Sequence, residues 1–183
     1  MINNRSTWQT IKPNSTVDIQ HVYSQNHISI LKLQNYFLGG HCQWRYAPFI
    51  DNPKDIDKFQ FIHVFFTKCN PVSGDYSILD PVFRKIQMKS LYRIKANLLT
   101  RTPEIVENSF HYDVSDFTPE QAKNWLTSIL YINTNNGYTR FETGEVIESV
   151  ENRLVTFPAN LKHTGTSCTD EKVRVVVNFN YFS

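Results

Sequence analysis

The chain has 183 residues, of which 40% are hydrophobic and 14% aromatic, and its formal net charge is +2 at pH 7. This length fits one domain that buries roughly 70% of its unfolded surface, enough for a core without disulfides or a structural metal. The near-neutral charge excludes the strongly basic footprint of a dedicated nucleic-acid-binding protein, so the sequence carries no strong nucleic-acid signature.

The first part of the chain predicts a mixture of helices and strands. Apolar spacing predicts a helix over 28–38, which a pair of glycines ends. Aromatic and β-branched residues predict strands over 43–46 and 58–66. Apolar residues at helical spacing then predict a second helix over 77–89, packed on the sheet.

After the second helix, nearly every segment is typical of a strand, because β-branched and aromatic residues dominate and turn residues separate the runs. A series of short strands after a helical segment indicates a mainly β (α+β) protein with a jelly-roll double sheet and N-terminal flanking helices. We expect one domain over 1–183, with an N-terminal extension over 1–40 and the core over 92–182. The predicted strands span 92–101, 109–114, 126–133, 138–141, 146–150, 153–157 and 173–181.

The tripeptide His111-Tyr112-Asp113 is the strongest candidate for a functional motif. On a strand, the period of two points His111 and Asp113 to one face and Tyr112 to the other. Two imidazoles and a carboxylate are the facial ligand set of non-haem Fe(II) oxygenases, and His163 completes the set if the sheet folds back on itself. For the tripeptide alone, a surface strand with alternating polar groups remains an alternative.

Arg174 lies in the apolar run 173–179, where an unpaired guanidinium is costly. Strand alternation places Arg174 on the face of Asn178, opposite the neighbouring valines. A buried arginine at this place should face an anion, and a bidentate carboxylate is its best match, so a dicarboxylic cosubstrate fits. The alternative is an ordinary salt bridge to Glu148 or Glu151.

Two further sets of polar residues have alternative interpretations. Arg93, Lys95 and Asn97 share one face of a predicted strand, and they line a substrate channel or lie on a solvated sheet face. His63, in an aromatic strand, is an alternative ligand to His163. We expect His63 to be a core histidine with satisfied hydrogen bonds instead, because it has no partner motif.

Several segments resemble the core of the 2-oxoglutarate and Fe(II)-dependent dioxygenases, on the prolyl-hydroxylase-like side. The resemblance is carried by 131–141 and 153–158, which lie between the tripeptide and the distal histidine, and by 163–174, which contains that histidine and Arg174. The segment 93–98 further resembles small members of this family that bacteriophages encode. The resemblance covers about 43–182 and implies a double-stranded β-helix, the cupin-like form of the jelly roll.

The resemblance also implies the roles of individual residues. His111, Asp113 and His163 then bind iron and form the catalytic centre, and Arg174 binds the distal carboxylate of 2-oxoglutarate. The retained Asp113 implies a hydroxylase or demethylase rather than a halogenase. The implied cofactors are Fe(II), 2-oxoglutarate as cosubstrate and O2, with ascorbate as an accessory reductant. A tyrosine that some relatives place against the cosubstrate is replaced here by Leu130, and the further cosubstrate-binding candidates are Asn97, Tyr131 and Thr139.

The resemblance favours hydroxylation of a C–H bond in a protein or peptide side chain, prolyl above all. Two alternatives stay open: a nucleotide or nucleic-acid oxygenase or demethylase, and a non-catalytic jelly-roll protein that binds a ligand or belongs to a virion. The sequence has no hydrophobic signal core and no apolar run that spans a bilayer. Its three cysteines fit neither a disulfide framework nor a zinc motif, so we expect a soluble protein of the cytoplasm, of the host if phage-encoded. The cysteines are Cys42, Cys69 and Cys168.

Overall fold

The computed structural model describes residues 17–22, 28–54, 56–114 and 117–183. Within them, antiparallel strands form an eight-stranded and a three-stranded sheet. The large sheet has the order β1 (Asp18–His21), β9 (Arg153–Pro158), β6 (Trp125–Tyr131), β11 (Val173–Phe182), β5 (Ser90–Thr100), β3 (Gln60–Thr67) and β2 (Arg45–Ala47), and β4 (Asn70–Pro71) pairs with β3. The small sheet has the order β10 (His163–Gly165), β7 (Tyr138–Phe141) and β8 (Val146–Glu148).

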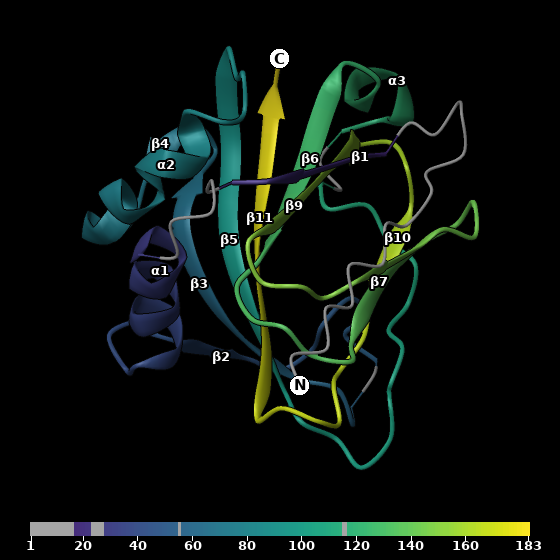
Figure 1. Ribbon diagram of the computed structural model, residues 1–183. Coiled ribbons are helices and arrows are strands. Elements are labelled where there is room, and N and C mark those ends of the chain that lie inside the picture. The colour runs from purple at the N-terminus through teal and green to yellow at the C-terminus, as the bar shows by residue number, and fades with distance from the viewer. Residues whose placement is uncertain (1–16, 23–27, 55, 115–116) are drawn as a thin grey trace, which may run out of the picture.

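The two sheets and the helices form layers (Figure 1). Helix α1 (Ile28–Leu38), the 3-10 helix η1 (Gly74–Leu79) and helix α2 (Asp80–Phe83) lie on one side of the large sheet, and the small sheet lies on the other. The main hydrophobic core joins α1 to the large sheet through residues such as Leu33, Phe65 and Ile94. A second core, with Phe141 and Phe157, lies between the sheets. This is the mainly β double-stranded β-helix architecture that the sequence predicted.

Strand β11 is buried on both faces because it lies between these two layers. Val175, Val177 and Phe179 belong to the helix-side core. Arg174 and Asn178, on the other face, line a pocket between the sheets. The predicted alternation along β11 is therefore confirmed, and it gives the pocket a polar wall within an apolar strand.

The helix predicted over 28–38 is confirmed as α1, but the helix predicted over 77–89 is wrong. In its place, η1 passes into the four-residue helix α2, which has Pro81 in its first turn. Proline has no backbone N–H and its ring collides with a preceding helical turn, so Pro81 is tolerated in the first turn of α2 but disfavours an α-helix that begins several residues before it. The chain then leaves the helix, and Lys89 donates a hydrogen bond to the carbonyl of Phe182 at the start of the β5–β11 pairing.

The strand predicted over 109–114 is also wrong, although the other predicted strands form with ends shifted by a few residues. This segment makes only isolated bridges, Glu107 with Thr166 and His111 with His163. The two bridges are out of register by one residue, so no regular ladder forms between them. Strands β1 and β10 and the one-turn helix α3 (Pro119–Ala122) were not predicted. No helix in the described part of the chain is long and apolar enough to cross a membrane.

Candidate active site

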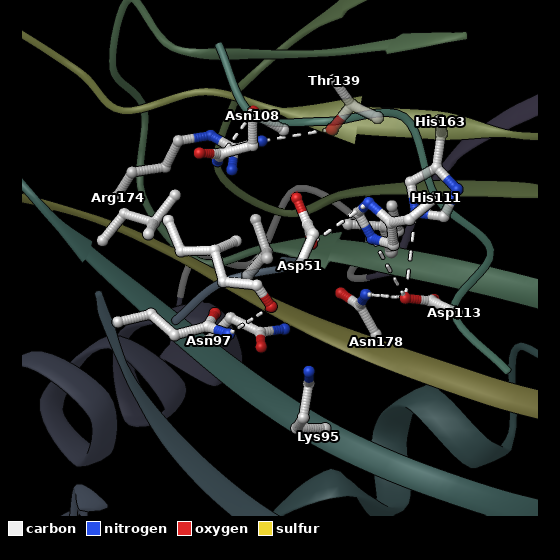
Figure 2. A pocket seen from close by; sticks show the side chains of 16 residues that line it. Asp51, Lys95, Asn97, Asn108, His111, Asp113, Thr139, His163, Arg174 and Asn178 are labelled. Atoms are coloured by element: carbon white, nitrogen blue, oxygen red, sulfur yellow. Dashed lines mark hydrogen bonds and ion pairs between the residues drawn. The ribbon is translucent and has the colours of Figure 1, made fainter. Parts of the chain in front are cut away.

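His111, Asp113 and His163 converge at one end of the pocket between the sheets (Figure 2). One possible ligand atom from each lies within 4.8 Å of the others. The Nε2 atoms of His111 and His163 are 4.0 and 3.8 Å from Oδ1 of Asp113. Metal bonds to histidine nitrogen and carboxylate oxygen are about 2.0–2.2 Å long, so one ion fits among donors at this spacing.

A two-residue bridge brings the histidines together from distant parts of the chain. The backbones of His111 and His163 exchange both N–H···O bonds, at 3.0 and 3.1 Å. Their rings therefore lie side by side, with centroids 4.8 Å apart. Asp113 follows two residues later and lies beside the same pair. From the sequence we expected a regular strand to bring His111 and Asp113 to His163, but one bridged pair, His111 with His163, is sufficient to bring the three side chains together.

Asp113 is a buried carboxylate held by an array of donors. Nδ2 of Asn178 donates to both carboxylate oxygens, at 3.0 and 3.1 Å, and Nδ2 of Asn180 donates to Oδ2 at 3.2 Å. A guanidinium nitrogen of Arg93 lies 3.5 Å from Oδ1. Burial raises the pKa of Asp113, but the charges of His163 and Arg93 outweigh it, so the pKa lies well below its usual range. The carboxylate is therefore ionised and fixed in orientation.

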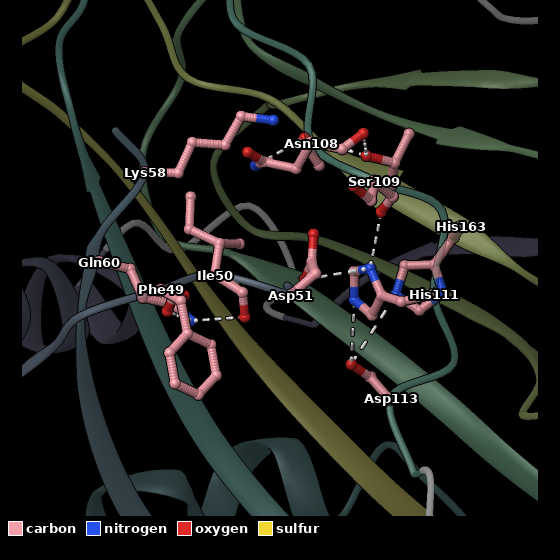
Figure 3. A network of polar contacts seen from close by, with 12 residues as sticks. Phe49, Ile50, Asp51, Lys58, Gln60, Asn108, Ser109, His111, Asp113 and His163 are labelled. Atoms are coloured by element: carbon pink, nitrogen blue, oxygen red, sulfur yellow. Dashed lines mark hydrogen bonds and ion pairs between the residues drawn. The ribbon is translucent and has the colours of Figure 1, made fainter. Parts of the chain in front are cut away.

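The surroundings of the two imidazoles support their use as ligands. Burial lowers the pKa of His163 to about 4, although Asp113 offsets part of this effect. Nδ1 of His111 lies 3.0 Å from the carbonyl of Ser109 and 3.2 Å from Oδ1 of Asp51 (Figure 3). Both neighbours are acceptors, so they favour a proton on Nδ1, while Nε2 faces Asp113. Such a contact on the outer nitrogen is the usual support for a metal-binding histidine.

Arg174 lies at the opposite end of the pocket and is almost completely buried, with 3% of its surface exposed. Its Nε donates to Oγ of Ser149 at 2.7 Å, and one Nη donates to Oγ1 of Thr139 at 3.1 Å. The guanidinium also lies over the ring of Tyr131, 5.6 Å from its centroid. Burial lowers the pKa of Arg174, which reflects the cost of a cation in this position.

Within the described residues, no carboxylate forms an ion pair with Arg174. The two acidic residues considered as alternative partners are engaged elsewhere or turned away. A carboxylate oxygen of Glu151 accepts a hydrogen bond from Gln34, and Glu148 is exposed and accepts one from Arg153 through its backbone carbonyl. The salt-bridge alternative for Arg174 is therefore wrong. A buried guanidinium without an acidic partner that lines a pocket is suited to bind an anionic ligand.

The other cosubstrate-binding candidates differ in their position. Asn97 and Thr139 line the pocket, and Oδ1 of Asn97 is buried without a hydrogen-bond partner. Tyr131 does not line it, but its hydroxyl donates to Oγ1 of Thr139 at 2.7 Å. Tyr131 therefore supports the residues around Arg174 from behind. Leu130 points to the opposite side, into the helix-side core.

Lys95 and Asp51 are pocket residues to which the sequence assigned no specific role. Lys95 lines the pocket together with Asn97, which favours the channel interpretation over a solvated sheet face. Asp51 comes from the segment before β3, which lies over the pocket because Nε2 of Gln60 donates to the carbonyls of Phe49 and Ile50 (Figure 3). In the sequence, Asp51 carries only the pattern of a turn, so no local signal indicates that it faces the site.

His63 is a core histidine with satisfied hydrogen bonds, as expected, and does not replace His163. Its Nδ1 lies 3.0 Å from the carbonyl of Gln43, and its Nε2 lies 3.0 Å from Oγ of Ser73. Its ring packs against Phe65 on the helix side of the sheet. Both nitrogens are thus occupied away from the pocket.

The sequence matches no protein-family model and no curated protein. The structure is similar to that of a viral collagen prolyl hydroxylase from Paramecium Bursaria Chlorella virus-1 in complex with 2OG, with a TM-score of 0.61 and 13% identity, covering 95% of this chain and 99% of that one. The structure is also similar to that of an oxidoreductase of the 2OG-Fe(II) oxygenase family from Burkholderia pseudomallei, with a TM-score of 0.60 and 7% identity, covering 91% of this chain and 85% of that one. For a prolyl-4-hydroxylase from Pseudomonas putida, the TM-score is 0.57 and the identity 12%, covering 92% of this chain and 93% of that one.

At these low identities the likeness shows the fold. The chain has the double-stranded β-helix fold of 2-oxoglutarate-dependent non-haem iron oxygenases, and His111, Asp113 and His163 form the His-Asp-His triad within it. Two histidines and one carboxylate are the ligand set typical of non-haem Fe(II) sites, so these three residues are suited to bind that metal. The donor set fits this metal, because the site offers two imidazoles and one ionised carboxylate, and the far end of the pocket holds a buried arginine that has no carboxylate partner among the described residues.

Proposed function

We propose that this protein is an Fe(II)- and 2-oxoglutarate-dependent oxygenase that hydroxylates a C–H bond of its substrate. The observation that carries the proposal is the presence of both binding elements in one pocket of this fold: the triad at one end and Arg174, without an acidic partner, at the other. A site that binds only a metal ion does not require a buried arginine such as Arg174. A cosubstrate that binds a metal at one end and carries a carboxylate at the other requires both.

In this proposal, the triad and Arg174 have defined tasks. His111, Asp113 and His163 hold the iron, and Asn178 keeps the carboxylate of Asp113 in orientation. Arg174 binds the distal carboxylate of 2-oxoglutarate, with Thr139, Asn97 and, indirectly, Tyr131 as supporting residues. When bound, Fe(II) with 2-oxoglutarate and O2 supplies the oxidising chemistry, and ascorbate serves as an accessory reductant.

For the substrate, we propose a protein or peptide side chain, with prolyl residues first. The support is the resemblance noted in the sequence and the names of two structural neighbours, the viral collagen prolyl hydroxylase and the Pseudomonas putida prolyl-4-hydroxylase. The resemblance of segment 93–98 to small phage-encoded members supports a bacteriophage origin as a further proposal, which places the protein in the host cytoplasm.

The proposal is tested by adding Fe(II) and 2-oxoglutarate to the purified protein under anaerobic conditions. We expect the weak visible charge-transfer band of the iron–2-oxoglutarate chelate, and succinate formation once O2 is admitted. If the band does not form at concentrations that saturate related sites, the chain does not bind the chelate. The result would then favour a non-catalytic ligand-binding jelly roll.

The backbone around Arg174 leads to a further prediction, for Gly137→Ala. A Cβ atom on Gly137 would lie 2.6 Å from the carbonyl oxygen of Ser167 and 2.7 Å from Cδ of Arg174. The variant should lose about 1–3 kcal/mol of stability, as is typical of overpacking, and should require more 2-oxoglutarate because Arg174 is displaced. Thermal melting and cosubstrate titration measure the two effects. Gly74→Ala is the control, since a Cβ there meets no atom within 4 Å. Equal behaviour of the two variants would contradict the prediction.

A further inference from the structure

Lys95 is a pocket cation that the proposed chemistry does not use. It lies on β5 and lines the same pocket as the triad and Arg174. Figure 2 shows its ammonium group pointing into the pocket, with no interaction drawn to another pocket residue. Burial lowers the pKa of Lys95 to about 8, and the charge of Arg93 adds to this effect, while the charges of Asp113 and Asp51 offset part of it. Lys95 is half-buried, so an anionic ligand that enters the pocket can pair with its ammonium group.

The register of β5 and β11 separates Lys95 from the cosubstrate arginine. Lys95 pairs with Asn178, whereas Arg174 pairs with Leu99, four residues away. At about 3.3 Å per residue, the two positions are roughly 13 Å apart along the strands. Asn178 also donates to Asp113, so Lys95 lies at the triad end of the pocket. Arg174 and the metal together account for both ends of 2-oxoglutarate, and the charge of Lys95 is left for another ligand.

The charges of the pocket indicate the kind of anion. The charged side chains that line it are Asp51, Lys95, Asp113 and Arg174, and Arg93 lies against Asp113, so these five groups together carry one net positive charge. Fe(II) and the 2-oxoglutarate dianion would balance each other. A singly charged carboxylate matches the single ammonium of Lys95. A phosphate dianion fits less well, because it brings a second negative charge into a pocket that already contains the carboxylate of Asp51.

Asp51 can contribute a second contact. Its Oδ1 lies beside His111, but its Oδ2 is buried and has no hydrogen-bond partner. A donor such as a peptide N–H satisfies the free oxygen. Lys95 thus offers a positive charge, and Asp51 a hydrogen-bond acceptor, to a substrate that binds next to the metal.

We propose that Lys95 is a substrate-binding residue that pairs with a carboxylate of the substrate, so that the natural substrate is a peptide with an acidic group next to the oxidised C–H bond. This inference rests on the proposed function, and it narrows the substrate class of the same site. The ion pair fixes one point of the substrate, the N–H bond to Asp51 fixes a second, and the adjacent carbon is directed to the metal.

The test uses three short peptides that differ in one group: N-acetyl-prolyl-aspartyl amide, its asparaginyl counterpart and its phosphoseryl counterpart. Their binding to the anaerobic protein with Fe(II) and 2-oxoglutarate is measured by calorimetry, which needs no turnover. We expect the aspartyl peptide to bind at least about 10-fold more tightly than the asparaginyl peptide, as for a charge-assisted hydrogen bond in a buried site. In Lys95→Met this preference should vanish, while the 2-oxoglutarate affinity stays the same.

Each other outcome overturns the inference. Failure of the aspartyl peptide to bind, equal binding of the aspartyl and asparaginyl peptides, or a preference that persists in Lys95→Met excludes the ion pair. Tighter binding of the phosphoseryl peptide assigns the cation to a phosphate. A weaker 2-oxoglutarate affinity in Lys95→Met assigns Lys95 to the cosubstrate. Lys32→Met, on the exposed surface of α1, is the matched control. Absence of the chelate band in the wild-type protein is a separate result and counts against the proposed function itself.

Discussion

Replacing His111 or Asp113 by alanine is expected to abolish the substrate-independent turnover of 2-oxoglutarate. Each variant leaves two of the three ligands, and the loss should exceed the 10- to 100-fold that is typical when only a supporting partner of a ligand is removed. The chelate band should disappear in parallel, because the metal no longer binds. Succinate formation and the anaerobic spectrum measure the two effects.

His111→Ala is the cleaner of the two variants. The side chain of His111 is 30% exposed, so its removal should change thermal stability little. Asp113→Ala leaves the donors of Asn178, Asn180 and Arg93 without their acceptor, and it should also lower the melting temperature. His21→Ala, at an exposed position of β1, is the control. Succinate production at the wild-type rate in His111→Ala would refute the assignment of the metal ligands.

Arg174→Ala is expected to raise the requirement for 2-oxoglutarate by roughly 100-fold, because truncation leaves a buried carboxylate without its cation. Iron binding should remain, since Arg174 lies at the end of the pocket away from the triad (Figure 2). Titration of the chelate band with 2-oxoglutarate measures the first effect, and metal analysis measures the second. Arg174→Lys should recover only part of the affinity, because an ammonium cannot form the bidentate contact of a guanidinium.

The matched control for this prediction is Arg101→Ala, since Arg101 is exposed just after β5 and does not line the pocket. Its 2-oxoglutarate requirement should equal that of the wild type. An unchanged requirement in Arg174→Ala would remove Arg174 from the cosubstrate site. Loss of iron binding in the same variant would instead mean that Arg174 maintains the structure of the pocket.

The secondary structure was predictable wherever a local pattern and the tertiary environment agree. Strand β7 and helix α1 have the predicted bounds, and β11 has the predicted faces. The prediction failed over 77–89, where apolar spacing indicated a helix but Pro81 interrupts it. It failed again over 109–114, where alternation indicated a strand but no partner lies in register. Alternation describes which way side chains point, and a strand also needs a neighbour to pair with.

The sequence by itself determined the chemical groups of the candidate site and the faces on which they lie. These groups are local features of the sequence, so the sequence alone reveals them: the His-Tyr-Asp tripeptide, the distal histidine and a lone arginine in an apolar strand. Only the tertiary structure decided that these groups meet in one pocket, that Arg174 has no acidic partner, and that Asp51 and Lys95 face the triad. These facts depend on contacts between residues far apart in the chain, which local periodicity does not encode.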